Sequence, residues 1–244
     1  MNLLNMRTIN LIVLLLATGA IFQSVELQAA QSNDGRQARQ LSGFHGISVS
    51  SGIDLNLTQK NVEEVFVEAN SDDLDKIITT VEDGILKIYI KDKSWLGLNW
   101  NKEPRKVFVS FKTLDKLDAS AGSDVNSAEV LKLDKLDLDV SSGSDVKLEL
   151  DAKQLRVNTS SGSDVSLNGK AEVAEVSASS GSDITAGDLE TKKCSANVSS
   201  GSDISIKVTE ELNAEASSGG DINYSGNPRV KNIKKSSGGD VNAR

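Results

Sequence analysis

The stretch Ser141-Ser142-Gly143-Ser144-Asp145-Val146 decides the fold, because close copies of it recur through the chain. Most copies lie 18 to 21 residues apart, and such regular spacing indicates one supersecondary unit stacked on copies of itself. An outlying copy, Ser51-Gly52-Ile53-Asp54, lies 70 residues before the next one. The glycines of the eight copies are Gly52, Gly122, Gly143, Gly162, Gly181, Gly201, Gly219 and Gly238.

The residues on both sides of this phrase alternate between apolar and polar. Leu136, Leu138 and Val140 precede the turn, and Val146 and Leu148 follow it. A period of two indicates β-strands with one buried face. Each unit is therefore predicted to contain a strand, a glycine turn, a second strand and a second, polar turn, as at residues 151–153, 168–170 and 226–228. Such units, stacked about 4.8 Å apart, form an all-β parallel β-solenoid, or β-helix, of two or three faces.

The repeated phrase also predicts columns of equivalent residues. Glycine supplies the positive φ that a sharp turn needs, and an aspartate two residues later can cap the turn. This aspartate column is Asp54, Asp124, Asp145, Asp164, Asp183, Asp203, Asp221 and Asp240. Counting by twos places the serine before each glycine in the interior, as a hydroxyl ladder of Ser142, Ser161, Ser180, Ser200, Ser218 and Ser237. Cys194 falls on the inward register and is predicted to be a small core residue.

The first part of the chain departs from this repeat. Residues 44–112 contain alternating segments and the pair Asp83-Gly84, which is a hairpin signal. We expect antiparallel strands here that insert into, or cap, the N-terminal end of the solenoid, since a solenoid needs its open edges protected. The solenoid coils of about 19 residues then occupy residues 113–244, in one continuous domain with residues 44–112.

Residues 1–30 have the order of segments found in a secretory signal peptide. Arg7 precedes an apolar run from Ile9 to Phe22, and cleavage is expected after Ala29 or Ala30. The run is shorter than the ~20 residues of a membrane span. Residues 31–43 are then predicted to be a linker. We expect an exported protein, in the periplasm, at the cell surface or secreted, with no membrane span in the mature chain.

Composition excludes several classes of partner. The formal net charge of −8 argues against nucleic acid and against anionic membranes. The single cysteine allows no intramolecular disulfide, so stability in an oxidising compartment must come from the fold. Two Trp, two Tyr and five Phe are few for a conventional core, but a ladder of stacked aliphatic side chains needs few aromatics.

The aspartate column is the strongest candidate for chemistry. Stacked carboxylates repel each other and can recruit Ca²⁺. Calcium-binding β-rolls, however, repeat every nine residues, with the apolar residue two positions after Asp, whereas here the period is about 19 and the apolar residue follows Asp directly. Turn capping is therefore the preferred interpretation, no cofactor is expected, and calcium is the alternative. No catalytic residue is predicted.

The second candidate is a loop that contains both tryptophans. Trp95 and Trp100 lie among Lys91, Lys93, Lys102 and Arg105, and they are either folded back onto the cap or exposed as a contact for a glycan or a protein. His45 is the single histidine, and packing at the surface or in a turn is preferred over a functional role.

The chain resembles the head GIN domain family of exported bacterial adhesin-like proteins. The resemblance rests on the block from Phe44 to Leu55, on Asp83-Gly84-Ile85-Leu86-Lys87-Ile88, and on the serial Gly-Ser-Asp-Val turns, and it covers roughly residues 40–244. It implies a right-handed, pectate-lyase-like β-helix, an origin in Gram-negative bacteria, a role in adhesion at the cell envelope, and no established catalytic residues.

These observations predict a non-catalytic binding protein. Its expected partner is a glycan or another envelope protein. An enzyme of the polysaccharide-lyase type is the alternative from another class, but the outward positions are mostly Ser, Asp, Asn and Thr, with scattered Lys, which is thin support for cleaving an acidic polymer. A structural or assembly component of the envelope, with solenoid ends that stack, is the third possibility.

Overall fold

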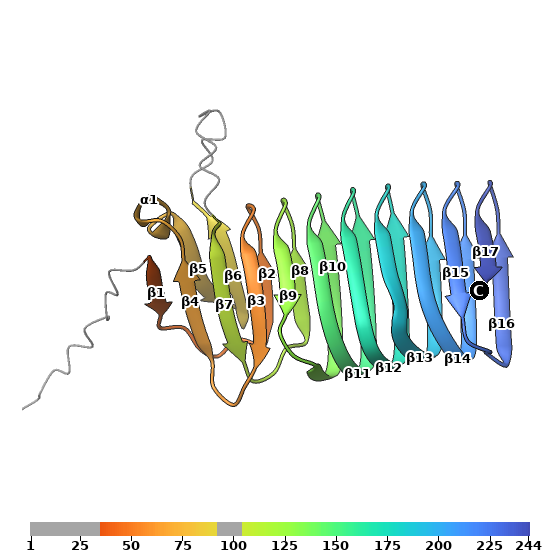
Figure 1. Ribbon diagram of the computed structural model, residues 1–244, viewed down its shortest axis with the longest axis horizontal. Coiled ribbons are helices and arrows are strands. Elements are labelled where there is room, and N and C mark those ends of the chain that lie inside the picture. The colour runs from red at the N-terminus through yellow and green to blue at the C-terminus, as the bar shows by residue number, and fades with distance from the viewer. Residues whose placement is uncertain (1–34, 92–103) are drawn as a thin grey trace, which may run out of the picture.

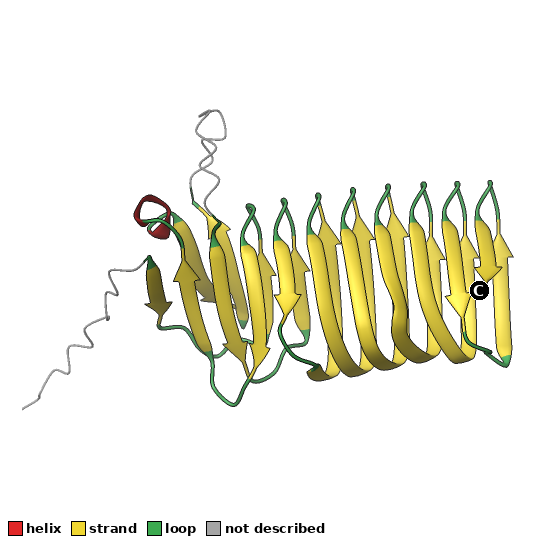
Figure 2. Cartoon of the chain, viewed as in Figure 1, coloured by secondary structure: helices red, strands yellow, loops and turns green. Residues whose placement is uncertain are grey.

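The predicted parallel β-solenoid is confirmed. The computed structural model describes residues 35–91 and 104–244. Coils follow one another along the long axis of the molecule, from the N-terminal strands to the C-terminal coil (Figure 1). Strands make up 67% of the described part of the chain, and its one helix, α1 (Ser71–Leu74), lies at the N-terminal end (Figure 2).

Four long strands form the body of the solenoid, and each makes nearly one complete coil. They are β11 (Asp145–Ser160), β12 (Asp164–Ser179), β13 (Asp183–Val198) and β14 (Asp203–Ala216). Shorter strands complete the coils on either side: β8 (Lys116–Ala119), β9 (Asp124–Ser127), β10 (Leu131–Ser141), β15 (Asp221–Ser225), β16 (Val230–Lys235) and β17 (Asp240–Ala243). Successive coils pair in parallel, so Val146 faces Val165 and Val157 faces Val176.

The prediction of a second, polar turn in each unit is wrong for the central coils. Residues 151–153 and 168–170 continue β11 and β12 as strand, and Asp151 pairs with Lys170 across the coils. The corner is made instead by two consecutive exposed residues, Lys153 and Gln154, which interrupt the alternation of buried and exposed side chains. The bend interrupts the pairing only at Lys153, since Ala152 and Gln154 on either side of it pair with both neighbouring coils, and this explains why polar residues here do not end the strand. Residues 226–228 do form a loop, between β15 and β16.

The interior is a set of stacked aliphatic columns. Val146, Val165 and Ile184 belong to one such column, and each is at most 2% exposed. Cys194 is buried between Ala174 and Leu212, and burial raises the pKa of its thiol to about 12. It is therefore a core residue, as its register predicted.

The N-terminal end mixes parallel and antiparallel pairing. Its strands are β1 (Arg36–Arg39), β2 (Gly46–Val49), β3 (Asp54–Gln59), β4 (Glu64–Glu68), β5 (Ile77–Glu82), β6 (Ile85–Ile90) and β7 (Lys106–Phe111). β6 and β7 pair in parallel with β2 and β3, so they extend the two faces of the solenoid. β4, β1 and β5 are antiparallel to their neighbours and form the outermost layer. β1 falls within the segment expected to be a linker.

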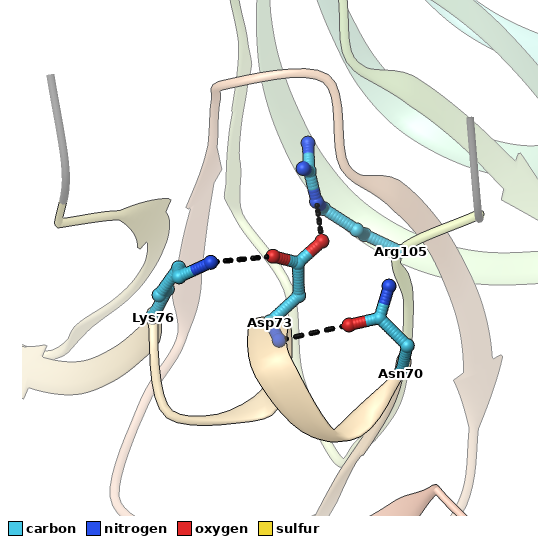
Figure 3. A network of polar contacts seen from close by, with 4 residues as sticks. All are labelled: Asn70, Asp73, Lys76 and Arg105. Carbon is cyan, nitrogen blue, oxygen red and sulfur yellow. Dashed lines mark hydrogen bonds and ion pairs between the residues drawn. The ribbon is translucent and has the colours of Figure 1, made fainter. Parts of the chain in front are cut away.

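An acidic side chain holds α1 to this N-terminal layer (Figure 3). The Asp73 carboxylate accepts hydrogen bonds from Arg105 Nε at 2.9 Å and from Lys76 Nζ at 3.1 Å. Asn70 caps the helix by accepting a bond from the Asp73 amide. Burial raises the pKa of Asp73, but the bonds from Arg105 and Lys76 outweigh burial, so the pKa lies below its ordinary value. The network is structural, because both carboxylate oxygens are engaged within the protein.

The sharp turns have the same backbone geometry in every coil. Gly143 has φ +68°, and Ser142 before it has φ +59°, so two consecutive residues are left-handed, as in the type I′ turn. The glycine amide donates to the carbonyl oxygen of the serine one coil further on, as from Gly143 to Ser161 at 3.2 Å. The turns therefore form a hydrogen-bonded ladder of their own along one edge of the solenoid.

The prediction that the serine before each glycine faces inward is wrong, because the buried serine lies two positions later in the chain. Ser142 and Ser161 are exposed, because the left-handed turn shifts the alternation. The buried hydroxyls belong to the serine after each glycine: Ser123, Ser144, Ser163, Ser182 and Ser202, all 0% exposed. Ser144 donates its amide to Ser163 Oγ at 3.2 Å, and Ser123 donates to Ser144 Oγ at 3.1 Å. In the last coils Gly220 and Gly239 replace this serine, and their amides bond within their own turns.

Replacing a turn glycine should lower the stability only because the new residue must adopt a positive φ. A Cβ at Gly162 meets nothing within 4 Å, but φ is +68°. We expect Gly162→Ala to lower the free energy of unfolding by about 1–2 kcal/mol, and Gly162→Val by more than about 1 kcal/mol because a β-branched residue is strained there. Gly187→Ala, with equal space and no positive φ, is the control and should be nearly neutral. Urea unfolding of the variants measures the difference, and equal effects at both sites would contradict the argument.

The buried hydroxyl column can be tested in the same way. Ser163→Ala removes the acceptor of the buried Ser144 amide, which should cost about 1–3 kcal/mol. Ser161→Ala, at the exposed position first predicted to be inward, should change unfolding free energy by only a few tenths of a kcal/mol. A larger loss for Ser161→Ala than for Ser163→Ala in urea unfolding would reverse the assignment.

Candidate functional site

A polar groove runs along one outer face of the solenoid, on the strand segments that lead into the sharp turns. It has a volume of about 660 Å³. Two columns of outward side chains line it, each with one residue per coil. The first column is Asp139, Asn158, Ser177, Asn197 and Glu215, and the second is Ser141, Ser160, Ser179, Ser199 and Ser217.

The parallel register of the coils produces these columns. Asp139 pairs with Asn158, Asn158 with Ser177, and Ser177 with Asn197, so equivalent side chains repeat along the axis. At a strand spacing of about 4.8 Å, five coils give a site about 20 Å long. The core holds the floor in place, since Val140, Ala178 and Val198 point inward between the two columns.

Hydroxyl and amide groups dominate the chemistry of the groove. Asn158 Nδ2 donates to Asp139 Oδ1 at 2.9 Å, so neighbouring coils share hydrogen bonds along the first column. Serine hydroxyls both donate and accept, and each amide side chain offers a carbonyl and an NH₂ group. The lining includes neither Lys, Arg nor His. The surface is therefore suited to a neutral ligand rich in hydroxyl groups.

Carboxylates mark the two ends of the groove. At the N-terminal end Asp118 pairs with Asp139. Partial burial raises the pKa of Asp118; Lys116 opposes the shift, and Asp139 and Asp137 add to it. At the other end Glu215 lies 3.8 Å from Lys234 in an exposed pair. Negative charge at the N-terminal end disfavours an acidic polymer there, whereas at the other end Lys234 offsets the charge of Glu215.

Sequence reasoning missed this groove, although a signal for it was present. In every coil a serine lies two positions before the turn glycine, and the residue two positions before that serine is polar, as in Asp139-x-Ser141, Asn158-x-Ser160 and Asn197-x-Ser199. The alternation places both residues of such a pair on the outside. Treating the motif serine as part of the turn hid the fact that two polar columns share one face.

The predicted aspartate column lies on the other face, in register. Asp124 pairs with Asp145, and Asp145 with Asp164, beside a hollow of about 290 Å³ that Asn126, Lys147 and other residues line. The Asp183 carboxylate accepts from the Asp203 amide of the next coil at 3.0 Å. This bond links coils, whereas the predicted cap lies within a single turn. In the part of the chain that the structure describes, no group of three or more His, Cys, Asp or Glu side chains is arranged to hold a metal ion.

The remaining candidates have different outcomes. Trp95 and Trp100 lie outside the described residues. His45 is half exposed, and its Nδ1 lies 2.8 Å from Asp115 Oδ1. Its amide donates to the Gly84 carbonyl, so the ring packs at the Asp83-Gly84 turn. Among the described residues, no helix is long and apolar enough to cross a membrane.

Comparison with known proteins shows the family of the chain. Residues 43–228 match the family model described as "Putative auto-transporter adhesin, head GIN domain". The chain therefore belongs to the head GIN domain family, as its sequence motifs predicted. None of the curated proteins compared with the chain matches it at a significant level.

Solved bacterial structures share the fold. A "putative adhesin" from Bacteroides fragilis NCTC 9343 has a TM-score of 0.80 at 24% identity, over 86% of this chain and 96% of that one. A "putative lipid binding protein" from Parabacteroides distasonis ATCC 8503 has a TM-score of 0.65 at 22% identity, over 87% and 98%. A "putative adhesin" from Parabacteroides merdae ATCC 43184 has a TM-score of 0.64 at 18% identity, over 86% and 95%. At these identities the likeness establishes the fold alone.

Burial and charge repulsion in the aspartate column should appear as a pH-dependent stability. Desolvation, together with Asp54 and Asp145 on either side, raises the pKa of Asp124. The folded state then binds this proton more tightly than the unfolded state, so the ionised carboxylate destabilises the fold at neutral pH. Asp124→Asn should raise the melting temperature at pH 7. The gain should shrink as pH falls through the raised pKa and vanish below the unfolded value of about 3.9.

An exposed aspartate outside the column is the control for this experiment. Asp188→Asn, which removes the same charge next to Asn168, should change the melting temperature little at either pH. A gain for Asp124→Asn that persists below pH 3 would show that charge repulsion is not its cause.

Proposed function

We propose that the protein is an exported, non-catalytic adhesin-like protein that binds a neutral glycan along the polar groove. Membership of the adhesin family supports a role in binding outside the cytoplasm. The observation that carries the proposal is the pair of in-register columns, serine on one side and Asp, Asn, Ser or Glu on the other. A linear polysaccharide presents hydroxyl groups at regular intervals, and a surface with regularly repeated donors and acceptors complements it.

The composition of the groove favours binding over cleavage. A lyase needs a base that removes a proton from the sugar; the lining includes no Lys, Arg or His, and its two carboxylates, Asp139 and Glu215, already contact Asn158 and Lys234. Each coil repeats nearly the same side chains, so one position does not stand out as a reaction centre. Affinity then comes from several modest contacts in series. No cofactor is part of the proposal.

A pair of asparagine replacements tests the groove. We expect Asn158→Ala with Asn197→Ala to weaken binding to a neutral polysaccharide by about 30-fold, because each replacement removes roughly 1 kcal/mol of hydrogen bonding. The matched control is Asn126→Ala with Asn223→Ala, which removes the same chemistry from the opposite face. The assay is titration calorimetry on the ligands found by screening the purified protein against neutral and acidic polysaccharides.

Three outcomes would overturn the groove assignment: equal loss in both pairs, no effect of the groove pair, or a preference for acidic polymers. The double variant Trp95→Ala with Trp100→Ala tests the predicted contact at Trp95 and Trp100 in the same assay. Loss of binding in this variant alone would move the site to that segment.

Calcium, added to the protein and then chelated, tests the alternative for the aspartate column: a melting temperature ten or so degrees higher with calcium would establish a binding site there.

A further inference from the structure

The two ends of the solenoid carry opposite charge. Residues 226–244, in the C-terminal coil, contain five cationic side chains and one acidic side chain, in a protein whose formal net charge is −8. Residues 61–83, which include β4, α1 and β5 at the N-terminal end, contain eight acidic side chains and one lysine, and these acids outnumber that lysine and the two arginines of β1 in the same layer. We call these the basic end and the acidic end.

The basic end results from lysines at positions that are interior in other coils. On β16, Lys231 pairs with Leu212, Ile233 with Ala214, and Lys235 with Ala216. Leu212, Ala214 and Ala216 are buried, whereas every residue of β16 is exposed. The interior columns therefore end in two lysines around an isoleucine that is 41% exposed.

Each end also presents an edge strand of the same face of the solenoid. β16 pairs with β14 and with no further described strand on its other side. At the opposite end of this face, β5 pairs with β6 and with no second described strand. Both strands have six residues. An unpaired edge offers backbone donors and acceptors to another strand.

The side chains of these two strands are complementary. β16 carries Lys231, Lys234 and Lys235 next to the exposed Ile233. β5 carries Glu82, which is exposed and paired with Lys87, with the exposed Asp72 and Asp75 nearby in the chain, and half-buried Val81 at its edge. The lysines of two basic ends repel each other, which protects this edge from pairing with its own kind. The same lysines are attracted to an acidic end.

We propose that the basic end of one copy docks on the acidic end of a second copy, with β16 alongside β5. The contact is heterologous, since it uses two different surfaces of the chain. It leaves one basic and one acidic end free on every assembly, so association continues into rows of copies and does not stop at a dimer. It does not depend on the ligand of the groove.

The experiment is sedimentation of the purified protein over a range of concentration and salt. We expect the weight-average mass to rise several-fold with concentration in dilute buffer. It should return to that of one chain in about 1 M salt, where the Debye length is about 3 Å. Lys231→Glu with Lys234→Glu should abolish association, as should Glu82→Lys with Asp75→Lys. An equal mixture of these two variants should regain association, because the intact basic end of one variant complements the intact acidic end of the other, and the two reversed ends also carry opposite charge.

Matched controls separate this contact from a general charge effect. Lys147→Glu with Lys170→Glu makes the same change of net charge at exposed positions in the middle of the solenoid, and it should leave association intact. Melting temperatures near that of the parent protein show that the variants fold. A parent protein that stays monomeric would overturn the proposal, as would association that stops at a dimer or is equally weakened by the controls. Binding of the basic end to anionic vesicles, without self-association, would assign that end to a membrane instead.

Discussion

The bond from each turn glycine to the next coil is the constraint on which the structure depends. In the turns of this solenoid both central residues are left-handed, and the residue before each glycine, a serine in every copy except Ala121, adopts this conformation without the freedom of glycine. Each such serine costs roughly 1–2 kcal/mol. The cost is offset because its carbonyl accepts the glycine amide of the preceding coil, as Ser161 does from Gly143. One coil alone lacks this partner, so the turn is stable only within the stack.

Stacking has a cost on the face that carries the aspartates. Two carboxylates about 4.8 Å apart repel by roughly 0.9 kcal/mol even in water. The strands keep these residues in register because the valines and isoleucines beside them form an unbroken interior column. Desolvation, and then repulsion from the neighbouring aspartates, raises the pKa of Asp124 and of Asp203. Core packing therefore decides the register, and the repulsion between the surface carboxylates is too small to change it.

The same register that imposes this repulsion also creates the groove. Serine and amide side chains that are unremarkable in one coil become a continuous surface when five coils align. The surface belongs to the stack as a whole, which suits recognition of a polymer better than recognition of a small compact ligand. The two ends of the stack are specialised differently, with lysines at one end and carboxylates at the other.

The sequence by itself determined the solenoid, the coil length, the turn glycines and the family, because a strict repeat with a period of two leaves few alternative folds. The inward position of Cys194 followed from the same alternation. Three features were decided only by the tertiary structure. The left-handed serine shifts the alternation through the turn, so Ser144 is buried and Ser142 is exposed. The corner at Lys153-Gln154 stays within one strand because the neighbouring coils pair with Ala152 and Gln154, on either side of Lys153. The groove exists because residues 19 or so positions apart meet across coils, and a linear pattern does not show which two columns share a face.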